Sequence, residues 1–196
     1  MQPKRPGDKR DIPVPQRGQV LHALPYSVMV VHAQQADARP LRSNIDKDQG
    51  HLAVRQLLQQ SRIELLHNRC ATLRLNGREV KLTGVADAWS ENLNLAAAFP
   101  PAETGGEATR ILLSHNPDTK EFLKFHPWDL LLCGHTHGGQ VVLPGLGAPW
   151  TPVRDKRFIA GMYSWDNRWI HITRGVGNVH GLRFNCPPEV SLVTLL

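Results

Sequence analysis

Apolar and polar positions follow a regular pattern only from about residue 50 onward. Residues 51–62 carry apolar side chains at helical spacing and predict a helix. The short apolar run at residues 63–66 predicts a strand. Residues 72–75 and 80–83 alternate apolar and polar side chains on either side of an Asn-Gly pair, which is typical of a β-hairpin. This part of the chain therefore predicts one helix followed by paired strands.

Two continuous apolar runs dominate the next part of the chain. They lie at residues 110–113 and 129–133, and residues 117–125 between them predict a helix that begins after Asn116. Continuous apolar runs separated by a helix are typical of parallel strands buried on both faces. The pattern therefore predicts an α/β fold. Shorter elements are expected on either side, namely a helix at residues 91–99 and strands at residues 140–143, 157–163, 169–173 and 190–196.

The first residues of the chain differ in character from the rest. Residues 1–46 are rich in Pro, Arg and Gln and show little sustained periodicity, so we expect an irregular segment that forms no compact unit alone. The chain's 196 residues favour one domain with room for a two-layer core, and residues 47–196 carry its regular part. The pattern therefore places a single domain boundary near residue 47.

Composition and charge exclude several protein classes. The chain has 41% hydrophobic and 20% charged residues, as in globular proteins, and its three scattered cysteines do not suit a disulfide scaffold. No apolar run is long enough for a transmembrane helix, and no apolar segment follows Met1. A cytoplasmic location is therefore expected for the chain as written, although an intact relative could be exported or membrane-associated. The net charge of +6 favours phosphate-bearing partners, but no Lys/Arg run marks a nucleic-acid-binding tail.

Three histidines follow the two apolar runs. His115 comes shortly after the first run, and His135 and His137 come after the second, within Gly-His-Thr-His-Gly-Gly-Gln. The carboxyl ends of parallel strands lie at one edge of a sheet. We therefore expect the three imidazole rings to approach one another at that edge.

The residues around these histidines suit metal binding. Glycines before His135 and after His137 permit unusual backbone dihedral angles and leave the rings uncrowded. On extended backbone both rings would point to one side, whereas a turn could offer them to neighbouring metal ions. His115 lies at a helix start, where the positive dipole end favours the neutral imidazole that binds metal. Imidazole suits several divalent transition metals, so the spacing predicts a metal centre without choosing the metal.

The order of these motifs resembles that of the calcineurin-like metallophosphoesterases. Ser-His-Asn-Pro-Asp at residues 114–118 is followed by Pro-Trp-Asp-Leu-Leu-Leu-Cys-Gly-His-Thr-His-Gly-Gly-Gln at residues 127–140. Residues 152–157, 173–177 and 188–190 extend the match. The resemblance covers about residues 49–196 and is strongest to the bacterial YaeI-type phosphodiesterase branch.

This resemblance implies a four-layer α/β/β/α sandwich with a binuclear metal centre. By position, His115 and His135 would bind one metal ion and His137 the other. The ions would be divalent metals such as Mn, Fe or Zn, and a metal-activated water would attack phosphorus. The implied substrate is a phosphoester, either a small molecule or lipid-like, and the oligomeric state is left open. The expected function is therefore that of a metal-dependent, phosphodiesterase-like hydrolase.

The first part of the chain departs from the family pattern. The family's D-x-H motif is absent from the whole sequence. Residues 7–11 fit its G-D-x-x-D motif, and residues 43–46 resemble a G-N-H-D motif in which Ile45 replaces the histidine. Asp8 and Asn44 are therefore candidate metal ligands, and no catalytic residue is assigned. A truncated start, a shifted reading frame and a divergent N-terminus each stay open, and the departure predicts an impaired enzyme.

Two other interpretations stay open. A catalytically inactive remnant that binds a phosphate ligand is favoured by the missing motifs, and a metal-dependent turnover assay separates it from the enzyme. A basic nucleic-acid-binding module would show a steep salt dependence of DNA binding.

Two single residues outside the histidine motifs each have two possible roles. Asp87 at a strand end either lies near the site or forms a turn. Arg174 either meets a substrate phosphate or forms a structural salt bridge.

Overall fold

The computed structural model describes most of the chain from residue 64 onward. The predicted irregular segment at residues 1–46, with the candidate ligands Asp8 and Asn44, lies outside the described residues. Within the helix predicted at residues 51–62, the described positions are helical. The described residues are 55–56, 58–60, 64–75, 77–89, 92–101, 107–178 and 181–195.

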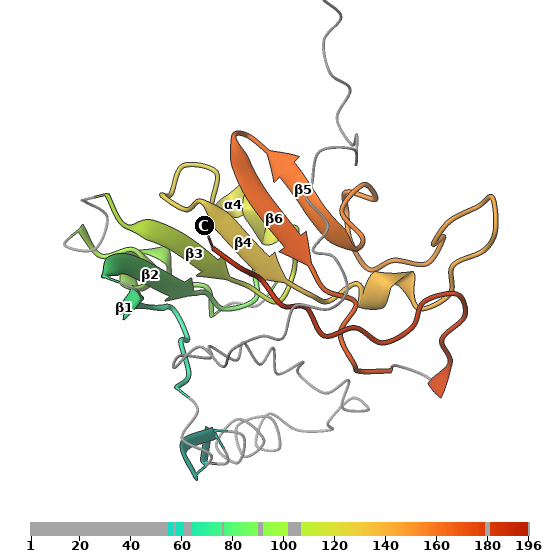
Figure 1. Cartoon of the computed structure of the whole chain (residues 1–196), viewed down its shortest axis with the longest axis horizontal. Coiled ribbons are helices and arrows are strands. Elements are labelled where there is room, and N and C mark those ends of the chain that lie inside the picture. The colour runs from blue at the N-terminus through green and yellow to red at the C-terminus, as the bar shows by residue number, and fades with distance from the viewer. Residues whose placement is uncertain are drawn as a thin grey trace, which may run out of the picture.

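The described residues form a six-stranded mixed sheet in the order β1-β2-β3-β4-β6-β5 (Figure 1). The four inner strands run parallel to one another, whereas β1 and β5 pair antiparallel with them at the two edges. The predicted α/β class with buried parallel strands is therefore confirmed. The strands are β1 (Arg69–Leu75), β2 (Arg78–Gly84), β3 (Thr109–Leu113), β4 (Leu130–Cys133), β5 (Gly161–Trp165) and β6 (Arg168–Ile172).

The predicted hairpin is formed by β1 and β2. Their pairing closes with Leu75 opposite Arg78, so two residues link the strands. Gly77 has a φ of +79°, a left-handed conformation that glycine adopts without a steric penalty. An Asn-Gly pair is the usual connection for such a two-residue turn. The local sequence therefore fixes the register of the first pair of strands.

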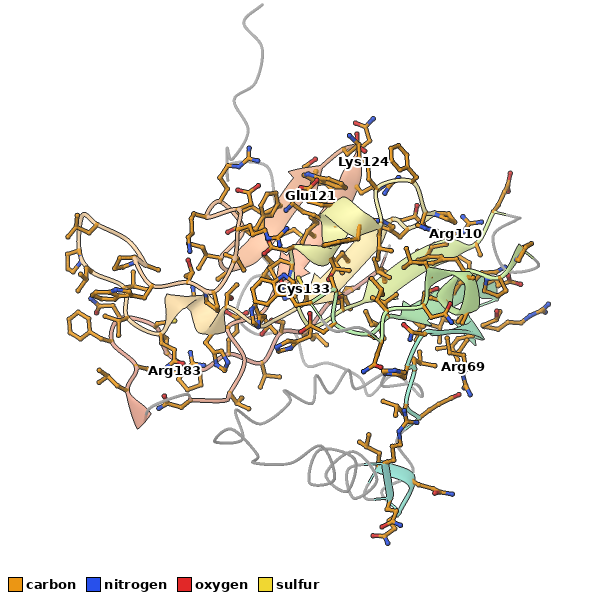
Figure 2. The ribbon with its side chains drawn as sticks, turned by 180° about the vertical axis from the view of Figure 1, so that it is seen from behind. Arg69, Arg110, Glu121, Lys124, Cys133 and Arg183 are labelled. Carbon is orange, nitrogen blue, oxygen red and sulfur yellow. The ribbon has the colours of Figure 1, made fainter. Side chains whose placement is uncertain are left out.

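Apolar side chains are buried on both faces of the sheet. One face packs under the short helices α2 (Leu95–Ala98) and α4 (Thr119–Phe122), and Figure 2 shows α4 across the face that points away from the viewer in Figure 1. The opposite face buries a smaller apolar group from β2 and β3. The core under the helices consists of Val85, Ala98, Leu112, Leu123, Trp128, Leu131, Cys133, Phe158, Ile170 and Ile172.

The helix predicted at residues 117–125 is shorter than expected. α4 ends at Phe122 because the Trp128 indole N–H donates to the carbonyl oxygen of Leu123 at 3.0 Å. The residue before a proline also disfavours helical backbone, and Pro127 follows closely. The buried indole contact therefore stops the helix one turn early.

Four predicted strands are absent, shorter or shifted among the described residues, and one of them, predicted at residues 157–163, starts only at Gly161. Residues 64–66 and 190–195 are not in strands, and residues 140–143 form only isolated bridges. Gln140 has a φ of +53°, which takes the backbone out of the extended conformation at the start of that segment. In the described part of the chain, no helix is long and apolar enough to cross a membrane.

Candidate metal centre

The sheet brings His115 and His135 into contact. His115 follows β3 and His135 follows β4, and these two strands are parallel neighbours. The Nε2 atom of His115 lies 3.0 Å from the Nδ1 atom of His135, and their ring centroids are 4.8 Å apart. The two histidines, 20 residues apart in the sequence, thus meet at the carboxyl edge of the sheet. The positions of the two parallel strands predicted this meeting.

A backbone carbonyl orients the His135 ring. Nε2 of His135 lies 2.8 Å from the carbonyl oxygen of Pro152. Because a carbonyl only accepts, Nε2 carries a proton in this contact, so the tautomer that it favours has its lone pair on Nδ1, toward His115. Histidines that bind metal commonly donate their other N–H to a carbonyl in this way, which fixes the tautomer.

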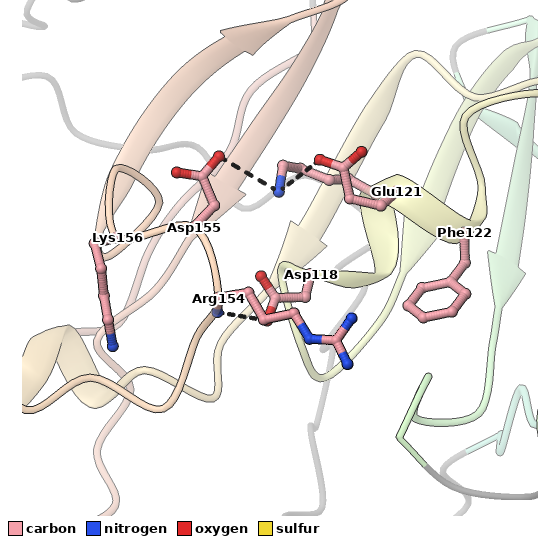
Figure 3. A pocket seen from close by; sticks show the side chains of 7 residues that line it. Asp118, Glu121, Phe122, Arg154, Asp155 and Lys156 are labelled. Atoms are coloured by element: carbon pink, nitrogen blue, oxygen red, sulfur yellow. Dashed lines mark hydrogen bonds and ion pairs between the residues drawn. The ribbon is translucent and has the colours of Figure 1, made fainter.

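The Pro152 carbonyl is itself held in place by the Ser-His-Asn-Pro-Asp motif. The buried Asp118 carboxylate accepts a hydrogen bond at 2.8 Å from the backbone N–H of Arg154 (Figure 3). Asp118 is also fixed locally, because its own N–H donates to the side-chain oxygen of Asn116 at 2.9 Å. The motif that supplies His115 therefore also anchors the segment that orients His135.

A charged pocket of about 630 Å³ lies beside this anchor. Lys120 is fully buried there, with its ammonium group 3.2 Å from Glu121 and 3.9 Å from Asp155 (Figure 3). Hydrogen bonding to the Arg157 side chain lowers the pKa of Asp155 below its ordinary value, which keeps this carboxylate ionised. The buried Lys120 ammonium group is paired with these two carboxylates, so its contacts indicate a structural role for Lys120.

Trp89 forms a wall of the histidine pair. Its ring meets the His135 ring edge-on, with centroids 5.2 Å apart. The Asp87 carboxylate accepts from the backbone N–H of Trp89 at 2.9 Å, so Asp87 shapes the turn that presents the indole. The structure therefore shows the turn role considered for Asp87, at a position that adjoins the histidine pair through Trp89.

The Gly-His-Thr-His-Gly-Gly-Gln segment is a turn, not an extended strand. His135 and His137 have φ values of 68° and 51°, in the left-handed region. Such backbone costs on the order of 1–3 kcal/mol per residue and concentrates at functional sites. Thr136 stabilises the turn, because its hydroxyl donates to the carbonyl of Ile159 at 2.6 Å and accepts from the N–H of Gly138 at 3.2 Å.

His137 has a different neighbour. Its Nδ1 atom lies 3.2 Å from the carbonyl oxygen of Gly177. The same reasoning as for His135 places a proton on Nδ1. The turn therefore sends the rings of His135 and His137 to different carbonyl partners.

Arg183 ties the histidine turn to the C-terminal segment. One of its terminal nitrogens donates to the carbonyl of His137 at 3.3 Å, and the other donates to the carbonyl of Gly177 at 2.5 Å. The same guanidinium also reaches the carbonyls of Arg174, Gly175 and Cys186. Figure 2 shows Arg183 among the loops at the end of the molecule where these segments meet. No local sequence pattern predicted this role.

Arg174 forms an ion pair in this region. Its Nε atom lies 3.6 Å from a carboxylate oxygen of Glu189. Of the two roles considered for Arg174, the structure shows the salt bridge.

The distance within the histidine pair fits two ligands of one ion. With metal–nitrogen bonds of roughly 2.0–2.1 Å, two nitrogens at this separation subtend an angle of about 90–100° at the metal. Among the residues that the structure describes, no group of three or more His, Cys, Asp or Glu side chains could hold a metal ion. The pair therefore supplies only part of a complete ligand set.

Comparisons with known proteins point to one family. Phosphodiesterase YaeI of Escherichia coli is 40% identical over 152 residues, which are 78% of this chain and 54% of YaeI. The UDP-2,3-diacylglucosamine pyrophosphatase LpxG of Chlamydia trachomatis is 29% identical over 148 residues, or 71% of this chain and 44% of LpxG. Metallophosphoesterase YkuE of Bacillus subtilis is 42% identical over 86 residues, or 43% of this chain and 30% of YkuE.

The chain spans about half the length of the curated relatives that match most of it. No family model and no solved structure matches the sequence. The relatives named above are a phosphodiesterase, a pyrophosphatase and a metallophosphoesterase, and the α/β sheet of this chain carries His115 and His135 at its strand ends. Over the aligned part of its length, the chain therefore belongs to the calcineurin-like metallophosphoesterases and resembles YaeI.

Proposed function

We propose that this chain is a metal-dependent phosphoesterase of the phosphodiesterase type. The contact between His115 and His135 carries the proposal, because their facing nitrogens are 3.0 Å apart at a strand edge. Among the relatives, YaeI is a phosphodiesterase and LpxG is a UDP-2,3-diacylglucosamine pyrophosphatase. The substrate class proposed here is accordingly a phosphoester, either a small molecule or a lipid-like one.

Each histidine has a proposed role. His115 Nε2 and His135 Nδ1 would hold one divalent ion, such as Mn, Fe or Zn, and His137 would contribute to a second. Such ions activate water and neutralise charge on the phosphoryl group. The carbonyls of Pro152 and Gly177 keep the two motif histidines in the tautomers that expose the binding nitrogen. The Trp89 ring covers one side of the pair and limits the approach of bulk water.

A second candidate function is binding of a phosphate ligand without turnover. The sequence has no D-x-H motif, and Ile45 stands where the family's G-N-H-D motif has a histidine. Two close cations need anionic ligands to offset their repulsion, and a missing general acid or base typically costs ~10²–10⁴-fold in rate. We therefore propose that the 196-residue polypeptide turns over slowly or not at all.

One experiment separates these functions. The purified chain would be assayed with added Mn²⁺ on a chromogenic phosphodiester, beside E. coli YaeI and beside His135→Ala and His126→Ala variants. We expect turnover at least about 10²-fold below that of YaeI, together with Mn²⁺ binding that is lost in His135→Ala and retained in His126→Ala. His126 is the matched control because its ring stacks on Phe99 at 4.5 Å, away from the histidine pair.

Each outcome decides between the proposals. Mn²⁺-dependent turnover that disappears in His135→Ala supports the enzyme, and Mn²⁺ binding without turnover supports the ligand-binding protein. Turnover as fast as that of YaeI would contradict the proposed impairment. Activity without added metal, or activity that survives in His135→Ala, would contradict the metal-dependent phosphoesterase itself.

A further inference from the structure

A group of exposed apolar side chains lies next to the histidine turn. Residues 138–153 contain no charged side chain, and among them Leu146 is 78% exposed and Trp150 is 70% exposed. On a neighbouring segment, Leu182 is 58% exposed and Phe184 is 48% exposed. Single exposed apolar residues are ordinary, whereas a contiguous group of large ones marks an interaction site. These four residues are called the apolar lobe below.

Hydrogen bonds join the two segments of the apolar lobe. The N–H of Val142 donates to the carbonyl of Phe184 at 2.9 Å, and the N–H of Phe184 donates to the carbonyl of Gln140 at 2.8 Å. The N–H of Leu143 donates to the carbonyl of Gly147 at 2.7 Å, which folds the first segment back on itself so that Leu146 lies in the turn. In Figure 1 both segments extend beyond the carboxyl ends of the strands.

The apolar lobe has a fixed position relative to the metal centre. Gln140 is the last residue of the histidine turn and also accepts the hydrogen bond from Phe184. Gly139 packs so closely on Ala148 that a Cβ atom at position 139 would lie 2.3 Å from the Cβ of Ala148. A binding partner of the apolar lobe would therefore lie near His137.

Basic side chains follow the uncharged segment directly. Arg154, Lys156 and Arg157 are exposed, and Asp155 is the one acidic residue among them. Three cations and one anion leave this stretch positively charged. Uncharged apolar loop residues that include a tryptophan, with cations beside them, are the composition of protein surfaces that enter the interface of an anionic bilayer.

We propose that the apolar lobe inserts into the interface of a lipid bilayer that contains anionic lipids. Leu146 and Trp150 bury their side chains at the level of the acyl-chain boundary, while Arg154 and Lys156 contact the charged headgroups and Arg157 stays paired with Asp155. Because the histidine turn is joined to the apolar lobe, His137 faces the headgroup layer, where lipid phosphoesters lie. This membrane binding requires neither bound metal nor hydrolysis. It can therefore be tested independently of the proposed phosphoesterase activity.

Vesicle sedimentation tests the proposal. The full chain would be mixed, in the presence of a chelator, with vesicles of phosphatidylcholine alone or of phosphatidylcholine with phosphatidylglycerol. We expect partitioning onto the anionic vesicles that weakens with added salt. The double substitution Leu146→Ser, Trp150→Ser should lower the partition coefficient by about 10²-fold, because each large apolar side chain contributes roughly a factor of ten. Phe125→Ser is the matched control.

The Phe125→Ser control and two contrary results decide the test. Phe125 is 93% exposed but precedes β4, at the opposite edge of the sheet, so its loss should leave vesicle binding unchanged. Equal binding by the double variant and the parent chain would overturn the proposal. So would absence of binding to both vesicle types, including the case in which the parent chain instead self-associates through the same residues, as measured by light scattering.

Discussion

Substitution of Gly139 by alanine is expected to lower the free energy of unfolding by about 2–5 kcal/mol, from a left-handed backbone penalty of about 1–2 kcal/mol and an overpacking cost of about 1–3 kcal/mol. The φ of Gly139 is +82°. A Cβ atom there would lie 2.3 Å from the Cβ of Ala148 and 3.2 Å from the Cγ2 of Thr151. Denaturant unfolding followed by tryptophan fluorescence measures the loss.

Gly145→Ala separates backbone strain from steric clash. Gly145 has a similar φ of +78°, but an added Cβ would meet nothing within 4 Å. We expect this variant to lose only the strain contribution of about 1–2 kcal/mol. Equal losses at both positions would show that the close packing of the histidine turn on Ala148 contributes nothing, and would contradict the described geometry of the turn.

Replacing Arg183 with methionine is expected to destabilise the fold by about 3 kcal/mol or more. One guanidinium donates to the carbonyls of five residues, including His137 and Gly177. Hydrogen bonds to a charged donor contribute about 1.5–3 kcal/mol each, and carbonyls left unpaired in a partly buried site add their desolvation cost. Because these contributions are not additive, we count only one to two of the five hydrogen bonds. The expected loss of about 3 kcal/mol is therefore a lower bound. Denaturant titration of the variant gives the value.

Two further variants define the Arg183 effect. Arg183→Lys keeps the charge but has a single nitrogen, so it should recover part of the loss. Arg74→Met makes the same change at an exposed position of β1 and should stay within about 0.5 kcal/mol of the parent chain. If Arg183→Met were as stable as Arg74→Met, the proposed network around His137 would not exist in solution.

The parallel part of the fold could be predicted because its signals are local. Residues 111–113 and 130–133 are apolar without interruption, and strands buried on both faces have that composition. The Asn-Gly pair indicated the hairpin for the same reason, but it left open the two-residue length of the loop that the strand pairing shows. Once these strands were placed, the positions of His115 and His135 followed from the rule that parallel strands end at one edge.

Other parts of the site depend on contacts that are distant in sequence. Arg183 reaches the carbonyl of His137 across 46 positions, and Trp89 meets a ring that is equally far along the chain. Neither contact leaves a periodic pattern in the sequence. The early end of α4 has a similar cause, because the Trp128 indole takes the carbonyl of Leu123. Local sequence specifies elements, whereas these contacts adjust their ends and complete the site.

The backbone of the histidine turn depends both on local sequence and on contacts that are distant in sequence. The flanking glycines indicated unusual dihedral angles, but the left-handed values at His135 and His137 themselves were not predictable from residue type. Histidine adopts this region only when surrounding contacts compensate for the strain. Those contacts are the Thr136 hydroxyl to Ile159 and the Arg183 guanidinium to His137.

The central claim is that His115 and His135 bind one divalent ion between their facing nitrogens. An anomalous-difference map at the zinc absorption edge, from crystals of the full chain soaked with Zn²⁺, tests it most directly. The account predicts a peak at roughly 2.0–2.1 Å from both His115 Nε2 and His135 Nδ1. A crystal that takes up zinc at other positions and shows no peak between these two nitrogens would contradict it.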